Sequence, residues 1–194
     1  MTRFIYDTAT SFTGWIADSN HSLQWLFDVP GGTEPDPELL PPGDALIVEG
    51  SSTYEWILGE SDLIQHPERW QELFGSRRTF VFTTRELPVP EGADVTFVSG
   101  PVRDVLSDLR EAAGASDVWI VGGGELAAQF FDAGALDEIA ISIAPVALTD
   151  GAPLFPRRVE SDRLHLVEAR QVGQFARLRF EVDATTTATE HADT

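Results

Sequence analysis

The chain has 194 residues, of which 42% are apolar, and its 13 basic and 32 acidic side chains give a formal net charge of −19 at pH 7. A chain of this length is expected to form one globular domain. All 13 basic residues are arginines, so chemistry that needs a lysine, such as a Schiff base or a P-loop, is excluded. Because the negative charge repels nucleic acid and anionic membrane surfaces, we expect neither as a partner.

The sequence also lacks cysteine and the usual membrane signals. Without cysteine, disulfides, thiolate catalysis and cysteine-ligated metals are excluded. Met1–Thr10 has no secretory signal pattern, and the apolar stretch Ile139–Thr149 is far shorter than the ~18 to 20 residues that cross a bilayer. We therefore expect a soluble, cytoplasmic protein.

No pattern indicates a metal site or a catalytic triad. The four histidines have neither HxxxH nor HExxH spacing, and no GxSxG motif occurs. We expect no metal ion, and these patterns assign no catalytic residue. The histidines are His21, His66, His165 and His191.

Short runs rich in β-branched and aromatic residues predict strands. They are Arg3–Thr10, Asp44–Glu49, Thr79–Thr84, Val95–Ser99, Asp117–Val121, Glu138–Leu148 and Leu164–Val182. The run Val118–Val121 is apolar throughout, as is typical of a strand buried on both faces. The last run has Gly173 near its middle and no helix, which predicts an antiparallel hairpin or bulged ribbon.

Three helices are predicted between these strands, which implies parallel crossovers. The clearest is Pro101–Ala113, with proline at the first helical position and Gly114 as its stop. A second covers about Glu125–Gly134. A third begins at Ser52, which has capping-box spacing with Glu55.

Two segments are expected to lie outside the sheet and helices. Five prolines and three glycines between Pro30 and Gly43 predict an exposed loop. The stretch 184–194 is rich in threonine, alanine and acidic residues and has nothing to bury, so we expect a disordered tail. The predicted domain is therefore 1–183.

Three consecutive glycines, Gly122–Gly124, join a predicted buried strand to the start of a helix. Unhindered amides and the positive end of a helix dipole suit a phosphate or pyrophosphate at this corner. The alternative is a tight turn that binds no ligand. The corner is not the GxGxxG dinucleotide motif, because Leu126 stands where the third glycine belongs.

Two further strand ends carry groups that suit phosphate oxygens. After the strand that ends at Gly50, Ser51–Thr53 opens a helix, and after Phe82 come two hydroxyls and a guanidinium, Thr83–Arg85. Ordinary helix capping and a solvated strand end are the alternatives. Together, the three strand ends favour a ligand that carries phosphate.

Six sequence blocks follow one another in an order typical of a known superfamily. They are Ser11–Ala17, Ser22–Leu26, Gly50–Glu55, Val121–Leu126, Ala144–Val146 and Gly151–Phe155. In this order they resemble the dihydrofolate reductase superfamily, in particular the branch with the reductase domain of bifunctional riboflavin-biosynthesis deaminase-reductases. The resemblance extends to about Val182. It implies an α/β fold with a mixed, mostly parallel central sheet of about eight strands, flanked by helices and ending in antiparallel strands.

The resemblance also implies that NADPH lies across the C-terminal strand ends. The residues beside the nicotinamide would be Ala9, Ile16 and Ala17, and those at the adenosine 2′-phosphate would be Thr83, Thr84 and Arg85. The block that meets the pyrophosphate would be Gly50, Ser51, Ser52 and Thr53. The residues around the central portion of the cofactor would be Val121, Gly122, Gly123, Gly124, Glu125 and Leu126. A cis peptide would join Gly122 to Gly123. Gln24 and Trp25 would lie at the substrate pocket, and the protein would be a homodimer.

Several positions depart from the pattern of that superfamily. Ser51 replaces the arginine of the G-R-x-T block, which removes one cation from the 2′-phosphate. Gln24 and Thr13 stand where acids are usual, and because an amide relays no proton, ordinary folate reduction is disfavoured. Val121 replaces the acid that precedes the glycines in riboflavin-pathway reductases, which disfavours their substrate.

From these features we expect an NADPH-dependent oxidoreductase that transfers hydride to a small conjugated substrate resembling a pterin or a pyrimidine. Two alternatives stay open. One is the riboflavin-pathway 5-amino-6-(5-phosphoribosylamino)uracil reductase. The other is a nucleotide- or metabolite-binding protein without turnover, which the missing acids favour.

Overall fold

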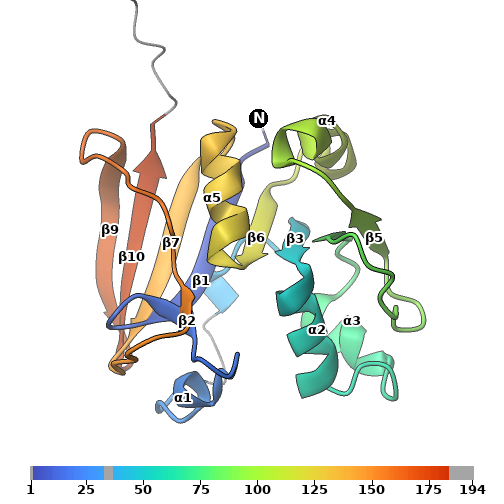
Figure 1. Ribbon diagram of the computed structural model, residues 1–194, viewed down its shortest axis with the longest axis horizontal. Helices are drawn as coiled ribbons and strands as arrows, with labels where there is room; N and C mark the ends of the chain where they lie inside the picture. Colours follow the sequence, from blue (N-terminus) through green and yellow to red (C-terminus); the bar gives the residue numbers. More distant parts are fainter. Residues whose placement is uncertain (1, 33–36, 184–194) are drawn as a thin grey trace, which may run out of the picture.

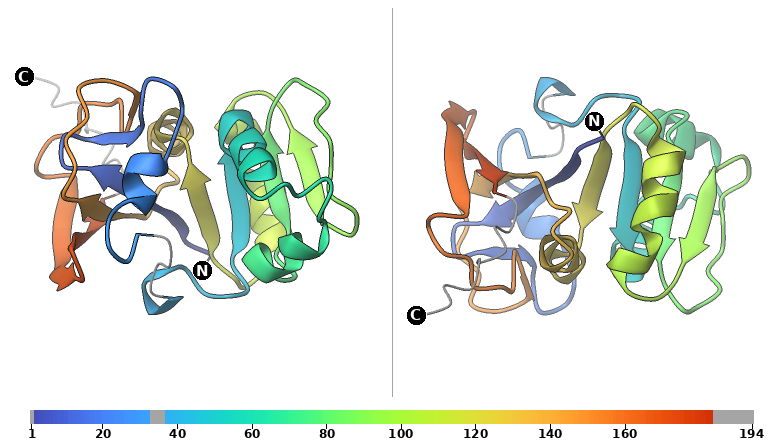
Figure 2. Two further views of the ribbon diagram at one scale, coloured as in Figure 1. Left: turned by 90° about the horizontal axis from the view of Figure 1, so that it is seen from below. Right: turned by 90° about the horizontal axis from the view of Figure 1, so that it is seen from above.

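The apolar runs form one eight-stranded sheet in the computed structural model, which describes residues 2–32 and 37–183 (Figure 1). Across the sheet the strand order is β5-β4-β3-β6-β1-β7-β10-β9. The strands are β1 (Phe4–Ser11), β3 (Leu46–Gly50), β4 (Thr79–Phe82), β5 (Val95–Val98), β6 (Val118–Gly122), β7 (Glu138–Ala144), β9 (Leu164–Val172) and β10 (Phe175–Val182). Figure 2 shows the β9–β10 edge at one end of the sheet and β5 at the other.

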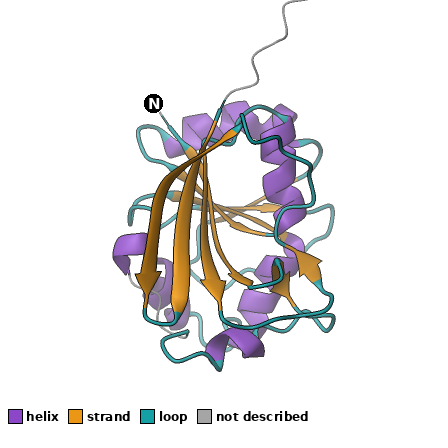
Figure 3. Cartoon of the chain, turned by 90° about the vertical axis from the view of Figure 1, so that its left-hand side faces the viewer, coloured by secondary structure: helices purple, strands orange, loops and turns teal. Residues whose placement is uncertain are grey.

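Strand directions confirm the expected mixed, mostly parallel sheet. Every neighbouring pair from β5 to β7 is parallel, whereas β10 pairs antiparallel with both β7 and β9. The predicted hairpin is β9–β10, whose long strands face the viewer in Figure 3. Gly173 occupies the turn of this hairpin with a φ of 56°, a conformation that glycine adopts at little cost. The register between β9 and β10 shifts between Arg179 and Phe180.

Helices bury apolar side chains against both faces of the sheet. The helices α4 (Val102–Ala113) and α5 (Gly124–Asp132) pack on the face that carries Leu46 and Val48. The helices α2 (Ser51–Glu60) and α3 (Glu68–Phe74) pack on the opposite face, against Val81. On α4, the predicted apolar stripe is buried at Val102, Val105 and Leu109, while Leu106 is half-buried.

Two predicted helix starts are wrong. Pro101 precedes α4 with an extended ψ of 144°, so the helix begins at Val102. The predicted capping box is absent, because α2 begins at Ser51 after Gly50 and has no side-chain cap. Glu55 instead binds Arg85, at the end of another strand.

The expectation that β6 is buried on both faces is also wrong. Its side chains alternate between buried and half-buried, with Trp119 and Val121 in the second group. On the half-buried face of β6, Trp119 Nε1 donates a hydrogen bond to the Asp7 carbonyl at 3.1 Å.

Short elements that the sequence analysis did not predict complete the described fold. They are α1 (Gln24–Phe27), the 3-10 turn Pro37–Leu39, and the two-stranded sheet of β2 (Trp15–Ala17) and β8 (Ala152–Pro153). Each is too short to show a periodic pattern. Residues 184–194, expected as a tail, lie outside the described residues. Among those described, no helix is long and apolar enough to span a membrane.

A buried ion pair links the first and last strands of the domain to the proline-rich loop. Both carboxylate oxygens of Asp7 accept hydrogen bonds from Arg177, at 2.8 and 2.6 Å, and these side chains are only 5% and 2% exposed. The guanidinium also donates to Ser142 Oγ at 3.2 Å and to the Leu39 carbonyl at 2.9 Å. This loop is therefore not simply exposed, as expected, and Pro41 within it is buried.

We expect Asp7→Asn to lower the free energy of unfolding by about 3 to 5 kcal/mol, because it leaves the buried Arg177 charge uncompensated. Urea denaturation measures the loss. The control is Asp94→Asn, which breaks an exposed 3.1 Å pair with Arg78 and should cost no more than about 1 kcal/mol. Equal losses in the two variants would contradict a structural role for the buried pair.

Candidate functional site

The C-terminal ends of four neighbouring parallel strands, β3, β4, β5 and β6, border one groove. Its volume is about 400 Å³. The lining residues are Gly50, Ser51, Ser52, Thr53, Phe82, Thr83, Thr84, Ser99, Gly100, Gly123, Glu125, Leu126 and Gln129. The structure thus brings together the three strand ends that the sequence predicts to bind phosphate. A groove at this edge is the usual ligand position in open α/β sheets.

The three glycines of the corner have different surroundings. A cis peptide joins Gly122 to Gly123, as the resemblance implies. A Cβ atom on Gly122 would lie 2.9 Å from Thr53 Oγ1, and one on Gly124 would lie 2.2 and 2.3 Å from two carbonyl oxygens of the segment after β8. At Gly123 the nearest heavy atom to such a Cβ is Ile16 Cδ1, at 3.9 Å. Gly122 and Gly124 therefore have no room for a side chain, whereas Gly123, which lines the groove, has room for a methyl group in van der Waals contact with Ile16.

Backbone amides supply hydrogen-bond donors at this corner. Helix geometry leaves the first amides of α5 without partners inside the helix, and the Ala127 amide is the one that bonds back to the Gly123 carbonyl, at 3.1 Å. The positive end of the α5 dipole points to the same place. The hydroxyls of Ser52 and Thr53 at the start of α2 line the facing wall of the groove.

The residues expected beside the nicotinamide are only partly brought to this corner. Ile16, on β2, lies against Gly123. Ala9 is half-buried in β1, and Ala17 pairs with Ala152 of β8. None of these three residues, nor Val121, is among the lining residues of the groove.

Arg85 lies apart from the two threonines that precede it. Thr83 and Thr84 line the groove, but Arg85 does not. Its backbone amide donates to Thr83 Oγ1 at 2.9 Å, and its guanidinium donates to both carboxylate oxygens of Glu55 on α2, with Nη1 to Oε1 at 3.0 Å. Both side chains are about half exposed, at 53% and 42%.

Of the residues that line the groove in the described structure, Glu125 alone is ionisable. Arg157, from the segment after β8, donates to both of its oxygens at 3.0 and 2.8 Å and to Asp132 at 2.8 Å. These hydrogen bonds from Arg157 hold the pKa of Glu125 below its usual value. Sequence reasoning missed Arg157, which offsets the negative charge that Glu125 places at the groove.

The predicted substrate residues lie on α1, outside the groove lining. Gln24 is exposed, and its Nε2 donates to Asp28 Oδ1 at 2.8 Å. Trp25 Nε1 donates to the Ser22 carbonyl at 3.1 Å. Asp28, four residues after Gln24, is a carboxylate that sequence reasoning did not single out. Helical spacing is the signal that could have found it.

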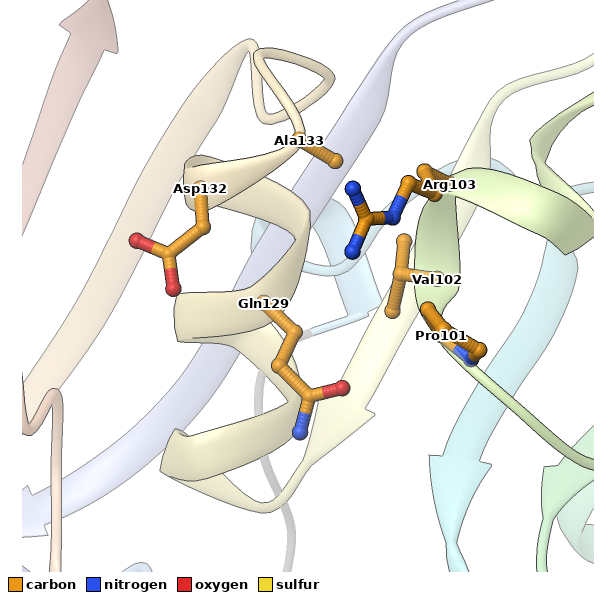
Figure 4. A pocket seen from close by; sticks show the side chains of 6 residues that line it. All are labelled: Pro101, Val102, Arg103, Gln129, Asp132 and Ala133. Atoms are coloured by element: carbon orange, nitrogen blue, oxygen red, sulfur yellow. The ribbon is translucent and has the colours of Figure 1, made fainter.

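A second cavity of about 400 Å³ lies between α4 and α5 (Figure 4). Its lining residues are Pro101, Val102, Arg103, Gln129, Asp132 and Ala133. Figure 4 shows the Arg103 side chain directed from α4 into the space before α5. Gln129 lines both this cavity and the groove, so the two adjoin. In the described part of the chain, no group of three or more His, Cys, Asp or Glu side chains is arranged to hold a metal ion.

Comparison with solved structures identifies the class of fold. Dihydrofolate reductase from Enterococcus faecalis, solved with NADP(H), aligns over 93% of this chain and 96% of its own, with a TM-score of 0.61 and 16% identity. RibD from Acinetobacter baumannii aligns over 94% of this chain and 58% of its own, with a TM-score of 0.71 and 19% identity. The fold is thus that of the dihydrofolate reductase superfamily.

Sequence comparison then gives the family. The RibD C-terminal domain profile matches residues 65–176, and the chain belongs to that family. A Shewanella sp. PV-4 protein assigned to riboflavin biosynthesis is 25% identical, with a TM-score of 0.70 over 94% of this chain and 99% of its own. The uncharacterized Bacillus subtilis proteins YwjB and YyaP are 29% and 27% identical, over 89% and 87% of this chain and 93% and 88% of their own lengths.

Two buried glutamates, one near the end of β3 and one at the start of β7, differ in the direction of their pKa shifts. Glu49 directly precedes Gly50, is fully buried, and has no hydrogen-bond partner for either carboxylate oxygen. Burial raises its pKa to about 8. Glu138 is also buried, but Arg179 at 2.9 Å and Arg3 at 2.8 Å more than offset the effect of burial and hold its pKa below the usual value.

Burial raises the pKa of Glu49 in the folded state. Above about pH 4.5, Glu49 therefore keeps its proton in the folded protein but releases it in the unfolded chain. The stability that this proton provides falls as pH rises and is lost above about pH 8. Relative to wild type, Glu49→Gln should therefore gain about 2 kcal/mol in unfolding free energy between about pH 6 and pH 8. Urea denaturation at several pH values measures this.

The matched control is Glu138→Gln, whose difference from wild type should stay constant over the same pH range, because its carboxylate is already ionised there. A pH-independent difference for Glu49→Gln would contradict a buried, protonated Glu49.

Proposed function

We propose that the protein is an NADPH-dependent reductase that transfers hydride to a small conjugated substrate resembling a pterin or a pyrimidine. The observation that carries the proposal is the groove of about 400 Å³ at a corner where four strand ends, two helix starts and several hydroxyls meet, with Gly123 in its lining. Membership of the RibD C-terminal domain family and the fold shared with an NADP(H)-bound reductase support it.

The residues present fit the diphosphate part of such a cofactor. Gly123 leaves room that a side chain would fill, and Ser52 and Thr53 supply hydroxyl donors at the helix start. Arg157 neutralises Glu125, so the corner carries no unpaired carboxylate against an anion. When bound, the nicotinamide supplies the hydride. The protein orients the two reactants, and Ile16 excludes water beside Gly123.

Proton delivery falls to a group other than Gln24, whose amide relays no proton. On α1, the carboxylate of Asp28 accepts the Gln24 amide and is the acid closest to it in the chain. We therefore propose that the unmodified protein reduces dihydrofolate poorly and takes its proton from solvent or from Asp28.

The riboflavin-pathway uracil reductase is the second candidate. The family match favours it, as does the Shewanella protein assigned to riboflavin biosynthesis. Val121, which stands where these reductases have an acid, argues against this substrate. The expected homodimer and cytoplasmic location stay predictions.

Gly123→Ala should weaken NADPH binding at least about tenfold while leaving the unfolding free energy within about 1 kcal/mol of wild type, because it adds a methyl group to a residue of the groove lining, where that group meets Ile16 and no backbone. Nicotinamide fluorescence gives the affinity, and urea denaturation gives the stability. Gly59→Ala is the control, since its Cβ on α2 has no neighbour within 4 Å; it should leave NADPH binding unchanged and raise the unfolding free energy by no more than about 1 kcal/mol, because alanine favours the helix. Unaltered binding by Gly123→Ala would contradict the proposed cofactor site.

Gln24→Glu should raise dihydrofolate reduction at neutral pH by at least about tenfold, since general acid catalysis contributes roughly 10² to 10⁴. A carboxylate at this position would face Asp28, now 2.8 Å from Gln24, and two such groups raise the pKa of one, which then carries a proton. Steady-state NADPH oxidation measures the gain. The control is Gln71→Glu on α3, which should have no effect; no gain from Gln24→Glu would place this residue outside the substrate pocket.

A further inference from the structure

The charges around the proposed 2′-phosphate end of the groove are held in ion pairs. Arg85 follows Thr83 and Thr84, which line the groove at the end of β4. Its two terminal nitrogens bind the two carboxylate oxygens of Glu55, in the first half of α2. The pair therefore joins the strand end to the helix and is neutral as a whole, so an incoming phosphate meets a guanidinium whose charge Glu55 already balances.

The lining residues contain no substitute for this cation. Ser51 is neutral, and Glu125 is the one ionisable group that the described lining includes. Two other arginines lie beside the lining. Arg157 is bound to Glu125 and Asp132, and Arg103 lies in the adjoining cavity between α4 and α5 (Figure 4). Arg103 approaches the groove from the side of Gln129, not from that of Thr83 and Thr84.

We propose that Glu55 sets the preference of the groove between NADPH and NADH, because the 2′-phosphate must compete with the Glu55 carboxylate for Arg85. The proposal rests on the proposed function, since it concerns a nicotinamide cofactor in this groove. The Glu55–Arg85 pair is half exposed, and such pairs are weak, so the competition is partial and the preference for NADPH is modest. NADH lacks the phosphate and does not enter the competition.

The test is the ratio of the two dissociation constants, measured by nicotinamide fluorescence on wild type and variants. Glu55→Gln frees Arg85 and should tighten NADPH binding about fivefold while leaving NADH binding unchanged. Glu60→Gln removes the same charge from the exposed end of the same helix and should leave the ratio unchanged.

A double-mutant cycle identifies the cation. Arg85→Ala should abolish the gain when added to Glu55→Gln, yet should weaken NADPH only slightly in the wild-type background, where Glu55 already occupies this arginine.

Several results would overturn the proposal. An unchanged or lowered NADPH preference in Glu55→Gln excludes Glu55 as its determinant. A preference lost in Arg103→Gln and unaffected at Glu55 would assign the phosphate to the second cavity instead. If wild type binds neither dinucleotide, the proposed function fails and this inference fails with it, whereas binding with an unaltered ratio refutes the inference alone.

Discussion

The fold depends on a point where no side chain fits. Any Cβ atom at Gly124 would lie 2.2 Å from the Pro153 carbonyl oxygen and 2.3 Å from that of Leu154, so the segment after β8 can cross the start of α5 only at a glycine. That segment is then fixed twice. Tyr6 on β1 donates to the Leu154 carbonyl at 3.0 Å, and Arg157 binds both ends of α5.

This close crossing also creates the groove. It fixes the start of α5, with its unpaired amides, beside the end of β3. Gly50 contributes to the same contact, since a Cβ there would lie 3.9 Å from the Gly123 nitrogen. Packing thus brings hydrogen-bond donors together where a side chain would otherwise stand, and the middle glycine lines the groove.

Charge is handled differently in the interior and at the site. Inside the sheet, Asp7 and Glu138 are bound to arginines, whereas Glu49, to which the described residues offer no hydrogen-bond partner, lowers its cost of burial by holding a proton. At the groove, ion pairs cancel the charges of Glu125 and Arg85. These ion pairs are local, even though the whole chain carries −19.

Sequence reasoning succeeds here where the signal is local. The stripe on α4, the Gly173 turn and the glycine corner are each contained in a dozen residues or so, and the structure confirms their helix, hairpin and strand-to-helix turn. The cis peptide followed from the family resemblance alone.

Partners distant in sequence could not be predicted. Asp7 and Arg177 are 170 positions apart, and Glu55 and Arg85 are 30 apart. The residue type at one position does not reveal which distant residue it will pair with. The capping-box prediction failed for the same reason, since the strand end at Arg85 offers Glu55 a cation that is stronger than a backbone amide as a partner.

The most direct test of the central claim, that a nicotinamide dinucleotide binds at the glycine corner, is an amide NMR titration of isotope-labelled protein with NADPH. The account predicts saturable shifts of the Gly123, Gly124 and Thr53 amides, with no shift at Gly173 in the β9–β10 turn. An unchanged spectrum, or shifts that leave the glycine corner unaffected, would contradict it.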